Sequence, residues 1–221
     1  MKKTLLSFLI TISFCLSMQA QALLWDSLSD RRLTFLKGEK HMNVEYVYDG
    51  VLINGKQEAD FLESQKDNLN EKDAKKGESF VTHWQTSKTA KYPKNFEHAF
   101  RSMARKNMRI AQGTKEKYTL VVKLVKVKTG EASFGNKAPS YADFEISFVE
   151  AASGKVLAKA RIINVKGIVK AKSNIGPQGS VMRVVARSVN IDVANRIAQC
   201  YESAAFATAK YVIRYNKKKK K

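Results

Sequence analysis

Three arginines, Arg101, Arg105 and Arg109, recur every fourth residue in the middle of the chain. Residues four apart lie on the same side of an α-helix, so this spacing predicts one exposed ridge of three guanidinium groups, with Lys106 beside it. Guanidinium forks match the oxygens of phosphate and carboxylate groups. The ridge either binds an anionic surface or is an ordinary solvated face opposite an apolar stripe, and the sequence leaves both interpretations open.

A run of lysines follows position 216. It has no apolar surface to bury, which predicts a disordered tail over residues 216–221. At an anionic leaflet each lysine contributes about 1 kcal/mol of attraction. The tail is therefore a second candidate anion contact, with a purely solvated segment as the alternative. Its lysines are Lys217, Lys218, Lys219, Lys220 and Lys221.

The sequence shows no pattern typical of catalysis or metal binding. His41, His83 and His98 are its three histidines, and none has a ligand-like neighbour at metal-binding spacing. No Gly-x-Ser-x-Gly elbow, Walker loop or Gly-x-Gly-x-x-Gly motif is present. Cys200 belongs to an apolar helical pattern and is interpreted as a core residue. We therefore expect no catalytic residue, no metal site and no cofactor.

Residues 1–22 have the three parts of a secretory signal peptide. Lys2 and Lys3 form the charged start, an apolar run follows from Thr4 to Met18, and Ala20-Gln21-Ala22 is a small-x-small cleavage site. The apolar run, about 15 residues, is shorter than the roughly 20 that a spanning helix needs. We expect export to the periplasm or outer membrane of a Gram-negative bacterium.

The charge balance favours an anionic partner. Lysine and arginine number 40 against 20 acidic residues, a formal net charge of +20. Such a field steers anions over long range and weakens with salt. Export makes nucleic acid an unexpected target, which leaves an envelope protein or an anionic lipid or glycan surface, with general solubility as the plain alternative. Outside the signal, no apolar stretch is long enough to cross a bilayer.

Hydrophobic periodicity predicts the elements of the first half. Alternation over residues 42–48 is typical of a strand, and a short strand at 51–53 lies between the turn dipeptides Asp49-Gly50 and Asn54-Gly55. Residues 57–69 are compatible with a helix, and the charged stretch 66–78 predicts a loop or a frayed helix end. Tyr92-Pro93 should stop any preceding element. Apolar residues at helical spacing then predict a helix from Phe96 to Ala111 that ends at Gly113.

The second half predicts three strands and a long helix. The strands are 118–128, 141–150 and 156–165, the last two forming an antiparallel hairpin around Ser153-Gly154. After a connector at 172–180, residues 181–215 predict a long helical region, whose length against the roughly 12-residue average is compatible with a break near Asn190. Its apolar stripe should lie on the sheet, and its water-facing residues should be Arg183, Arg187, Arg196 and Glu202. We expect a single α+β domain over residues 23–215, an antiparallel or mixed sheet of four to five strands covered on one face by two main helices.

Several segments resemble a known group of proteins. Lys137-Ala138-Pro139, the strand Asp143–Glu150 and the following Gly154–Lys159 resemble uncharacterised exported proteins of Bacteroides-type bacteria, as do the segments at 46–50 and 118–123. More distantly, the order of strand, helix, three strands and long helix is similar to the amino-terminal domain of TolB. The resemblance implies an envelope domain of unknown role and supplies no catalytic residue. Because the lysine tail and the cationic excess are not features of that group, the basic-surface hypothesis depends on this sequence alone.

Three hypotheses for function follow. The first is a non-enzymatic envelope module that binds another envelope component or an anionic surface. The second is a hydrolase acting on envelope glycan or lipid. The third is a structural subunit of a secreted or envelope assembly, with a sheet edge or the 181–215 helix as its interface.

Overall fold

The computed structural model describes residues 23–25, 33–71, 73, 75–130, 132–133, 136–167 and 192–216 of the 221-residue chain. Four predicted segments lie outside the described residues. They are the signal peptide at 1–22, the connector at 172–180, the first part of the long helix at 181–191, and Lys217 to Lys221. None of the described helices has both the length and the apolar character needed to cross a bilayer.

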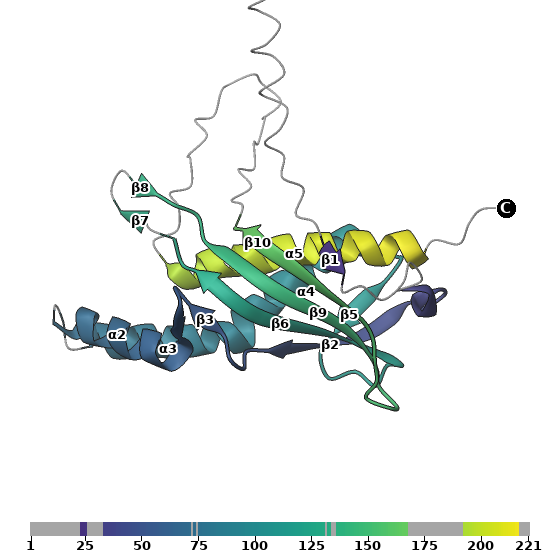
Figure 1. Ribbon diagram of the computed structural model, residues 1–221, viewed down its shortest axis with the longest axis horizontal. Coiled ribbons are helices and arrows are strands. Elements are labelled where there is room, and N and C mark those ends of the chain that lie inside the picture. The colour runs from purple at the N-terminus through teal and green to yellow at the C-terminus, as the bar shows by residue number, and fades with distance from the viewer. Residues whose placement is uncertain are drawn as a thin grey trace, which may run out of the picture.

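Eight strands of the described residues form one mixed sheet in the order β1-β10-β9-β6-β2-β5, with β3 beside β6 and β4 beside β3 (Figure 1). They are β1 (Leu23–Trp25), β2 (His41–Val47), β3 (Leu52–Ile53), β4 (Lys56–Gln57), β5 (Arg109–Ala111), β6 (Tyr118–Lys128), β9 (Tyr141–Glu150) and β10 (Val156–Lys166). Two further short strands, β7 (Ala132–Ser133) and β8 (Asn136–Lys137), pair separately. The predicted α+β class is confirmed. The sheet has more strands than expected because two- and three-residue strands leave almost no hydrophobic pattern.

The parallel part of the sheet follows from a long helical crossover. β2 pairs in parallel with both β5 and β6, and β3 pairs in parallel with β6. Parallel neighbours need a long connection, and here the chain from β2 to β5 passes through three helices. The remaining pairs, β1–β10, β10–β9, β9–β6 and β3–β4, are antiparallel.

The β9–β10 hairpin has the register that its alternation predicts. Phe144, Ile146 and Phe148 are buried on one face of β9, and Ile146 stands opposite Ala160 of β10. The register shifts near Asn164, whose φ is +52° and whose N–H donates to Asp143 Oδ1 at 2.7 Å. Such a bulge adds local twist to the end of β10.

Two main helices cover one face of the sheet, as predicted (Figure 1). They are α4 (Tyr92–Ala104) and α5 (Val193–Asn216), which pack against each other. The shorter helices α2 (Glu58–Asn70) and α3 (Lys76–Thr86) pair beside β3, beyond one end of the main layer (Figure 1). A 3-10 turn, η1, spans Thr34–Leu36, and a π turn, η2, spans Ser87–Lys91.

The stretch 66–78, predicted as a loop or a frayed helix end, is helical over most of its length, because α2 continues to Asn70 and α3 begins at Lys76. A close helix contact explains why. The Gly77 N–H donates to Asn70 Oδ1 at 2.9 Å, and a Cβ at Gly77 would lie 2.4 Å from the carbonyl oxygen of Lys66. The absence of a side chain at residue 77 therefore lets two polar helices approach.

The stop expected at Tyr92-Pro93 is also wrong, since α3, η2 and α4 follow one another without a break. Proline has no N–H to donate and its ring crowds the preceding turn. Here Pro93 lies in the first turn of α4, directly after the wider π turn at Ser87–Lys91. The wider turn accommodates the ring, and the chain stays helical.

The apolar stripe of α5 faces the sheet as predicted. Ile197, Cys200 and Ala204 are fully buried, together with Tyr201. The outward position expected for Arg196 is wrong, because this residue is 3% exposed and its Nε donates to the Thr129 carbonyl oxygen at 3.0 Å. A long side chain at the edge of the stripe has turned inward to satisfy a buried backbone acceptor.

Candidate functional site

The three candidate arginines do not share a helical ridge. α4 ends at Ala104, Arg105 lies just beyond it with φ +50°, and Arg109 is the first residue of β5. The helix predicted from Phe96 to Ala111 is therefore wrong after residue 104. Met103, in the last turn of α4, is 41% exposed.

Two features end the helix early. The backbone N–H and the side-chain amide of Asn107 both donate to the Ala104 carbonyl oxygen, at 2.9 Å and 3.0 Å, which satisfies an end carbonyl of α4. Beyond it Met108 and Ile110 are buried while Arg109 is exposed, a period of two, and β5 pairs with β2. Apolar residues at these positions suit either a helical stripe or a strand, and the pairing with β2 decides between them.

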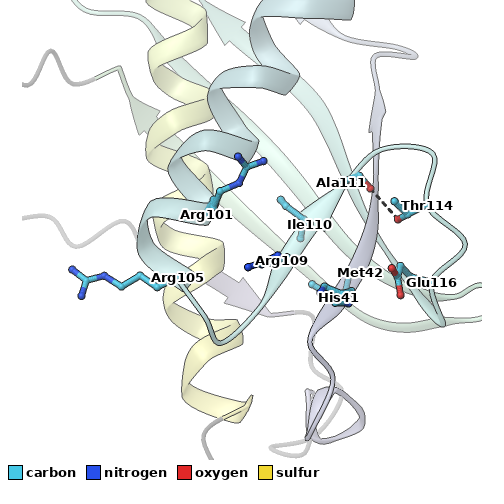
Figure 2. A pocket seen from close by; sticks show the side chains of 9 residues that line it. All are labelled: His41, Met42, Arg101, Arg105, Arg109, Ile110, Ala111, Thr114 and Glu116. Carbon is cyan, nitrogen blue, oxygen red and sulfur yellow. Dashed lines mark hydrogen bonds between the residues drawn. The ribbon is translucent and has the colours of Figure 1, made fainter.

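A surface hollow nevertheless brings the arginines together at the junction of α4 and β5. This α4–β5 hollow has a volume of about 690 Å³, and its lining includes Arg101, Arg105, Arg109, His41 and Glu116. Figure 2 shows Arg101 on the end of α4 and His41 and Arg109 on neighbouring strands, whereas Arg105 extends away from the other two. The parallel register of β2 and β5 places His41 opposite Arg109.

Among the described residues, the arginines of the hollow form no ion pair, although the carboxylate of Glu116 lines the same hollow. Within the described part of the chain, no ion pair joins a carboxylate to Arg101, Arg105 or Arg109. Glu97, which lies one turn before Arg101 on α4, instead accepts a hydrogen bond from Gln112 at 3.0 Å. The guanidinium donors are therefore available to the oxygens of a phosphate or carboxylate group.

Sequence reasoning found the arginines and missed their neighbours. His41 lies far from Arg109 in the sequence, and only the parallel β2–β5 pairing makes them adjacent. Glu116 follows β5 in the loop before β6. No local pattern could have indicated either residue, because a short parallel edge strand has no sequence signature. The other candidate group, Lys217 to Lys221, lies outside the described residues.

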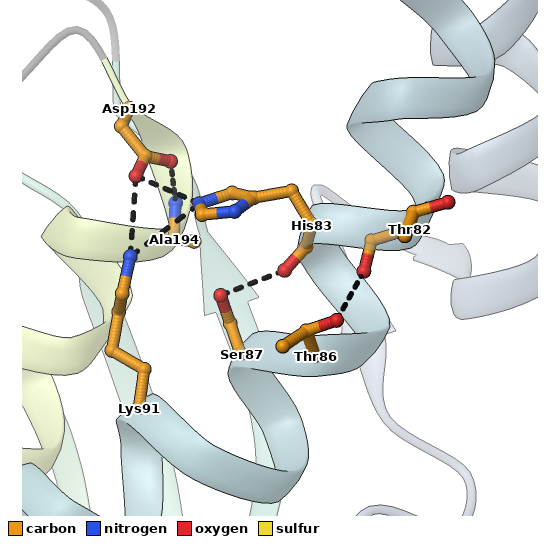
Figure 3. A network of polar contacts seen from close by, with 7 residues as sticks. All are labelled: Thr82, His83, Thr86, Ser87, Lys91, Asp192 and Ala194. Carbon is orange, nitrogen blue, oxygen red and sulfur yellow. Dashed lines mark hydrogen bonds and ion pairs between the residues drawn. The ribbon is translucent and has the colours of Figure 1, made fainter.

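A second polar cluster joins α3, η2 and α5 (Figure 3). His83 Nε2 lies 2.9 Å from Asp192 Oδ2, and Lys91 Nζ lies 3.4 Å from the same oxygen. The Ser87 hydroxyl donates to the backbone oxygen of His83, so it does not face the imidazole as a nucleophile would. Asp192 also accepts from the Ala194 N–H at 2.9 Å, which makes it the amino-terminal cap of α5.

The Asp192 cluster has the electrostatics of a structural contact. Burial alone would raise the pKa of Asp192, but hydrogen bonds from His83 and from the Ala194 N–H, together with the charge of Lys91, hold that pKa below its usual value. An ionised cap stabilises the positive end of the helix dipole. The cluster therefore fixes the start of α5 against the crossover helices.

Cys200 behaves as a core residue. It is fully buried, and burial raises the pKa of its thiol to about 12. Within the described residues, no group of three or more His, Cys, Asp or Glu side chains has an arrangement that could hold a metal ion. The α4–β5 hollow is thus the arrangement with the clearest binding chemistry.

Comparison with known proteins adds little. No protein-family model and no curated protein matches the chain. Two solved structures of the PelC dodecamer from Paraburkholderia phytofirmans are similar at 12% identity and a TM-score of 0.27. The match covers 57% of this chain and 70% of the PelC L103M chain in one crystal form, and 56% and 69% in the other. Likeness at this level carries no argument about function, which has to come from the residues themselves.

Proposed function

We propose that the protein is an exported, non-enzymatic binding module whose α4–β5 hollow holds a phosphate or carboxylate group of another envelope component. One observation carries the proposal: Arg101 and Arg109 line the same hollow, and among the described residues neither forms an ion pair. Export is supported by the charged, apolar and small-x-small segments of residues 1–22.

The geometry favours binding over hydrolysis. Among the described residues, the His83–Asp192 pair has Lys91 as its third partner, and the nearby Ser87 hydroxyl is bonded to a helix carbonyl. In the hollow, arginine side chains supply donors in a fixed fork. His41 and Glu116 also line it, but among the described residues no hydrogen bond joins them, and the Thr114 hydroxyl donates to the Ala111 carbonyl oxygen at 3.3 Å. The hollow therefore has the chemistry to hold an anion, and none of its described hydroxyl groups is paired with a base.

The test is a calorimetric titration of the chain from residue 23 with tripolyphosphate and, separately, with citrate. Each charge-assisted hydrogen bond contributes about 1.5–3 kcal/mol, and 1.4 kcal/mol is a factor of ten in affinity. We expect the double variant Arg101→Gln/Arg109→Gln to weaken binding by about tenfold or more. Comparison of the two titrants shows whether the hollow prefers phosphate or carboxylate.

The matched control removes the same charge elsewhere. Lys56, at the start of β4, and Lys155, just before β10, are exposed and do not line the hollow. The variant Lys56→Gln/Lys155→Gln should change the affinity less than about threefold, since only screened, long-range attraction is lost. Equal losses in the two double variants would show that the net charge, not the hollow, attracts the anion.

A further inference from the structure

A second hollow lies between the carboxyl-terminal ends of α4 and α5. Its volume is about 690 Å³, and its lining includes the apolar side chains of Met103, Phe206 and Ile213. Three cations, Arg105, Lys210 and Arg214, also line it, together with Ser102 and Asn107, and no carboxylate is among its described lining residues. This α4–α5 hollow therefore combines apolar and cationic side chains.

The exposure of Met103 and the spacing of the two α5 cations suit contact with a flat surface. Met103 is 41% exposed, one of the few large apolar side chains of the described residues in that position. Lys210 and Arg214 are four residues apart on the exposed side of α5, so both project from the same face. The Arg214 guanidinium lies over the Tyr211 ring at 5.7 Å, which orients it.

We propose that the α4–α5 hollow docks on the surface of an anionic phospholipid bilayer, with Met103 entering the boundary between headgroups and acyl chains. The cations complement lipid phosphates, while the apolar side chains of the lining gain contacts that a soluble polyanion would not provide. The proposal needs neither Arg101 nor Arg109, although Arg105 lines both hollows.

A rival explanation makes a different prediction. A cation in the last turn of a helix stabilises its negative end, so Arg214, with Lys210 one turn earlier, could serve the fold alone. In that case their removal would lower the melting temperature and leave lipid binding unchanged. Docking predicts that their removal weakens lipid binding and leaves the melting temperature unchanged. Thermal unfolding of each variant measures the melting temperature.

The experiment is co-sedimentation of the chain from residue 23 with vesicles of phosphatidylglycerol and phosphatidylcholine, and with phosphatidylcholine alone. Each cation near an anionic leaflet is worth about 1 kcal/mol, so Lys210→Gln/Arg214→Gln should weaken partitioning about 10- to 30-fold. The control Lys56→Gln/Lys155→Gln and the variant Arg101→Gln/Arg109→Gln should each change it less than about threefold. If Lys210→Gln/Arg214→Gln weakens partitioning onto the vesicles no more than the control variant does, the proposal is overturned.

Insertion is measured separately with an environment-sensitive fluorophore on Met103→Cys. The matched position is Ile163→Cys, which is 43% exposed on β10 and faces away from the buried neighbour Ile162. Cys200 is buried and should not be labelled. We expect a blue shift from residue 103 and none from residue 163, with phosphatidylglycerol vesicles only. Equal shifts, or binding that depends on Lys217 to Lys221 with no shift at residue 103, would contradict docking through this hollow.

If Arg101→Gln/Arg109→Gln abolishes vesicle binding and Lys210→Gln/Arg214→Gln does not, the lipid phosphate occupies the α4–β5 hollow instead. That result would overturn the docking proposal while supporting the proposed function. If the two sites are separate, Arg101→Gln/Arg109→Gln should lose tripolyphosphate binding and keep vesicle binding. The failure of one proposal can thus be told from the failure of the other.

Discussion

Substitution of Glu58 by glutamine tests the contact that ties α2 to the end of α3 and to η2. Glu58 Oε1 accepts hydrogen bonds from Trp84 Nε1 at 2.6 Å and from Lys88 Nζ at 2.9 Å, and Oε2 lies 2.8 Å from the same ammonium. The side chains of Lys88 and Glu58 are only 16% and 19% exposed. Trp84 itself is buried and packs on Phe61 at 5.5 Å.

The expected cost lies between two limits. Removal of one partner from a fully buried ion pair costs about 3–5 kcal/mol, whereas exposed pairs contribute about 0.2–1 kcal/mol. The Glu58–Lys88 pair keeps some contact with water, so we expect Glu58→Gln to lower the free energy of unfolding by about 2 kcal/mol. The amide oxygen of the variant can still accept from Trp84, but its amide nitrogen cannot pair with the ammonium of Lys88.

Urea unfolding measures the loss, with Glu78→Gln as the matched control. The Glu78–Lys66 pair is as short, 2.7 Å, but its side chains are 63% and 39% exposed, so its loss should cost less than about 1 kcal/mol. Addition of Lys88→Met to Glu58→Gln should cost less than the sum of the single losses, because the two residues share one interaction. If Glu58→Gln costs no more than Glu78→Gln, burial does not strengthen this pair and the reasoning is wrong.

Four further predictions test the backbone, the core and the helix cap. Gly130→Ala should cost about 1–3 kcal/mol in urea unfolding and clearly more than Gly113→Ala; both glycines have positive φ, but only at Gly130 would the Cβ meet a backbone oxygen, at 2.3 Å. Arg105→Gly should raise the melting temperature, because φ +50° with ψ −121° suits glycine better than arginine. The raised pKa and burial of Cys200 predict no reaction with iodoacetamide at pH 8 until the protein is unfolded, as mass spectrometry would show. The lowered pKa of Asp192 predicts stability that is present above the pKa of the unfolded chain and lost as pH falls through the folded pKa. The loss of stability on that acidification should therefore be smaller in Asp192→Asn, which keeps a good cap, as urea unfolding across a pH series would show.

The sequence predicted the elements whose patterns are long and unambiguous. Ten residues of alternating burial identify β9, and the spacing of Ile197, Cys200 and Ala204 identifies the inner face of α5. The prediction of secondary structure failed where the same residues fit either a helix or a strand. Met108 and Ile110 fit a helix continued from α4 or a separate strand, and only the pairing with β2, a segment more than 60 residues earlier, favours the strand.

Other errors came from contacts that no local pattern encodes. The missing side chain of Gly77 lets α2 and α3 approach, although the surrounding residues have the composition of a loop. Arg196 is buried because its guanidinium reaches the Thr129 carbonyl oxygen, an acceptor on a distant turn. The three arginines were found by their regular spacing, but the reason for their proximity was wrong.

The early end of α4 is what gives the cationic surface its form. In a helix continued to Ala111, Arg101 and Arg109 would be separated by about 12 Å along the axis, since each residue rises 1.5 Å. Instead, the turn at Arg105 and the Asn107 cap bring the chain back, so that Arg109 joins Arg101 in one hollow while Arg105 extends away from both (Figure 2). Arg105 also lines the α4–α5 hollow, so one residue in a strained backbone conformation stands between both cationic sites. Backbone strain of this kind costs about 1–3 kcal/mol and persists where the surrounding structure or a function holds it. A glycine would remove the strain, but it would also remove the one guanidinium that contributes to both surfaces, which is a physical reason for an arginine to occupy this turn.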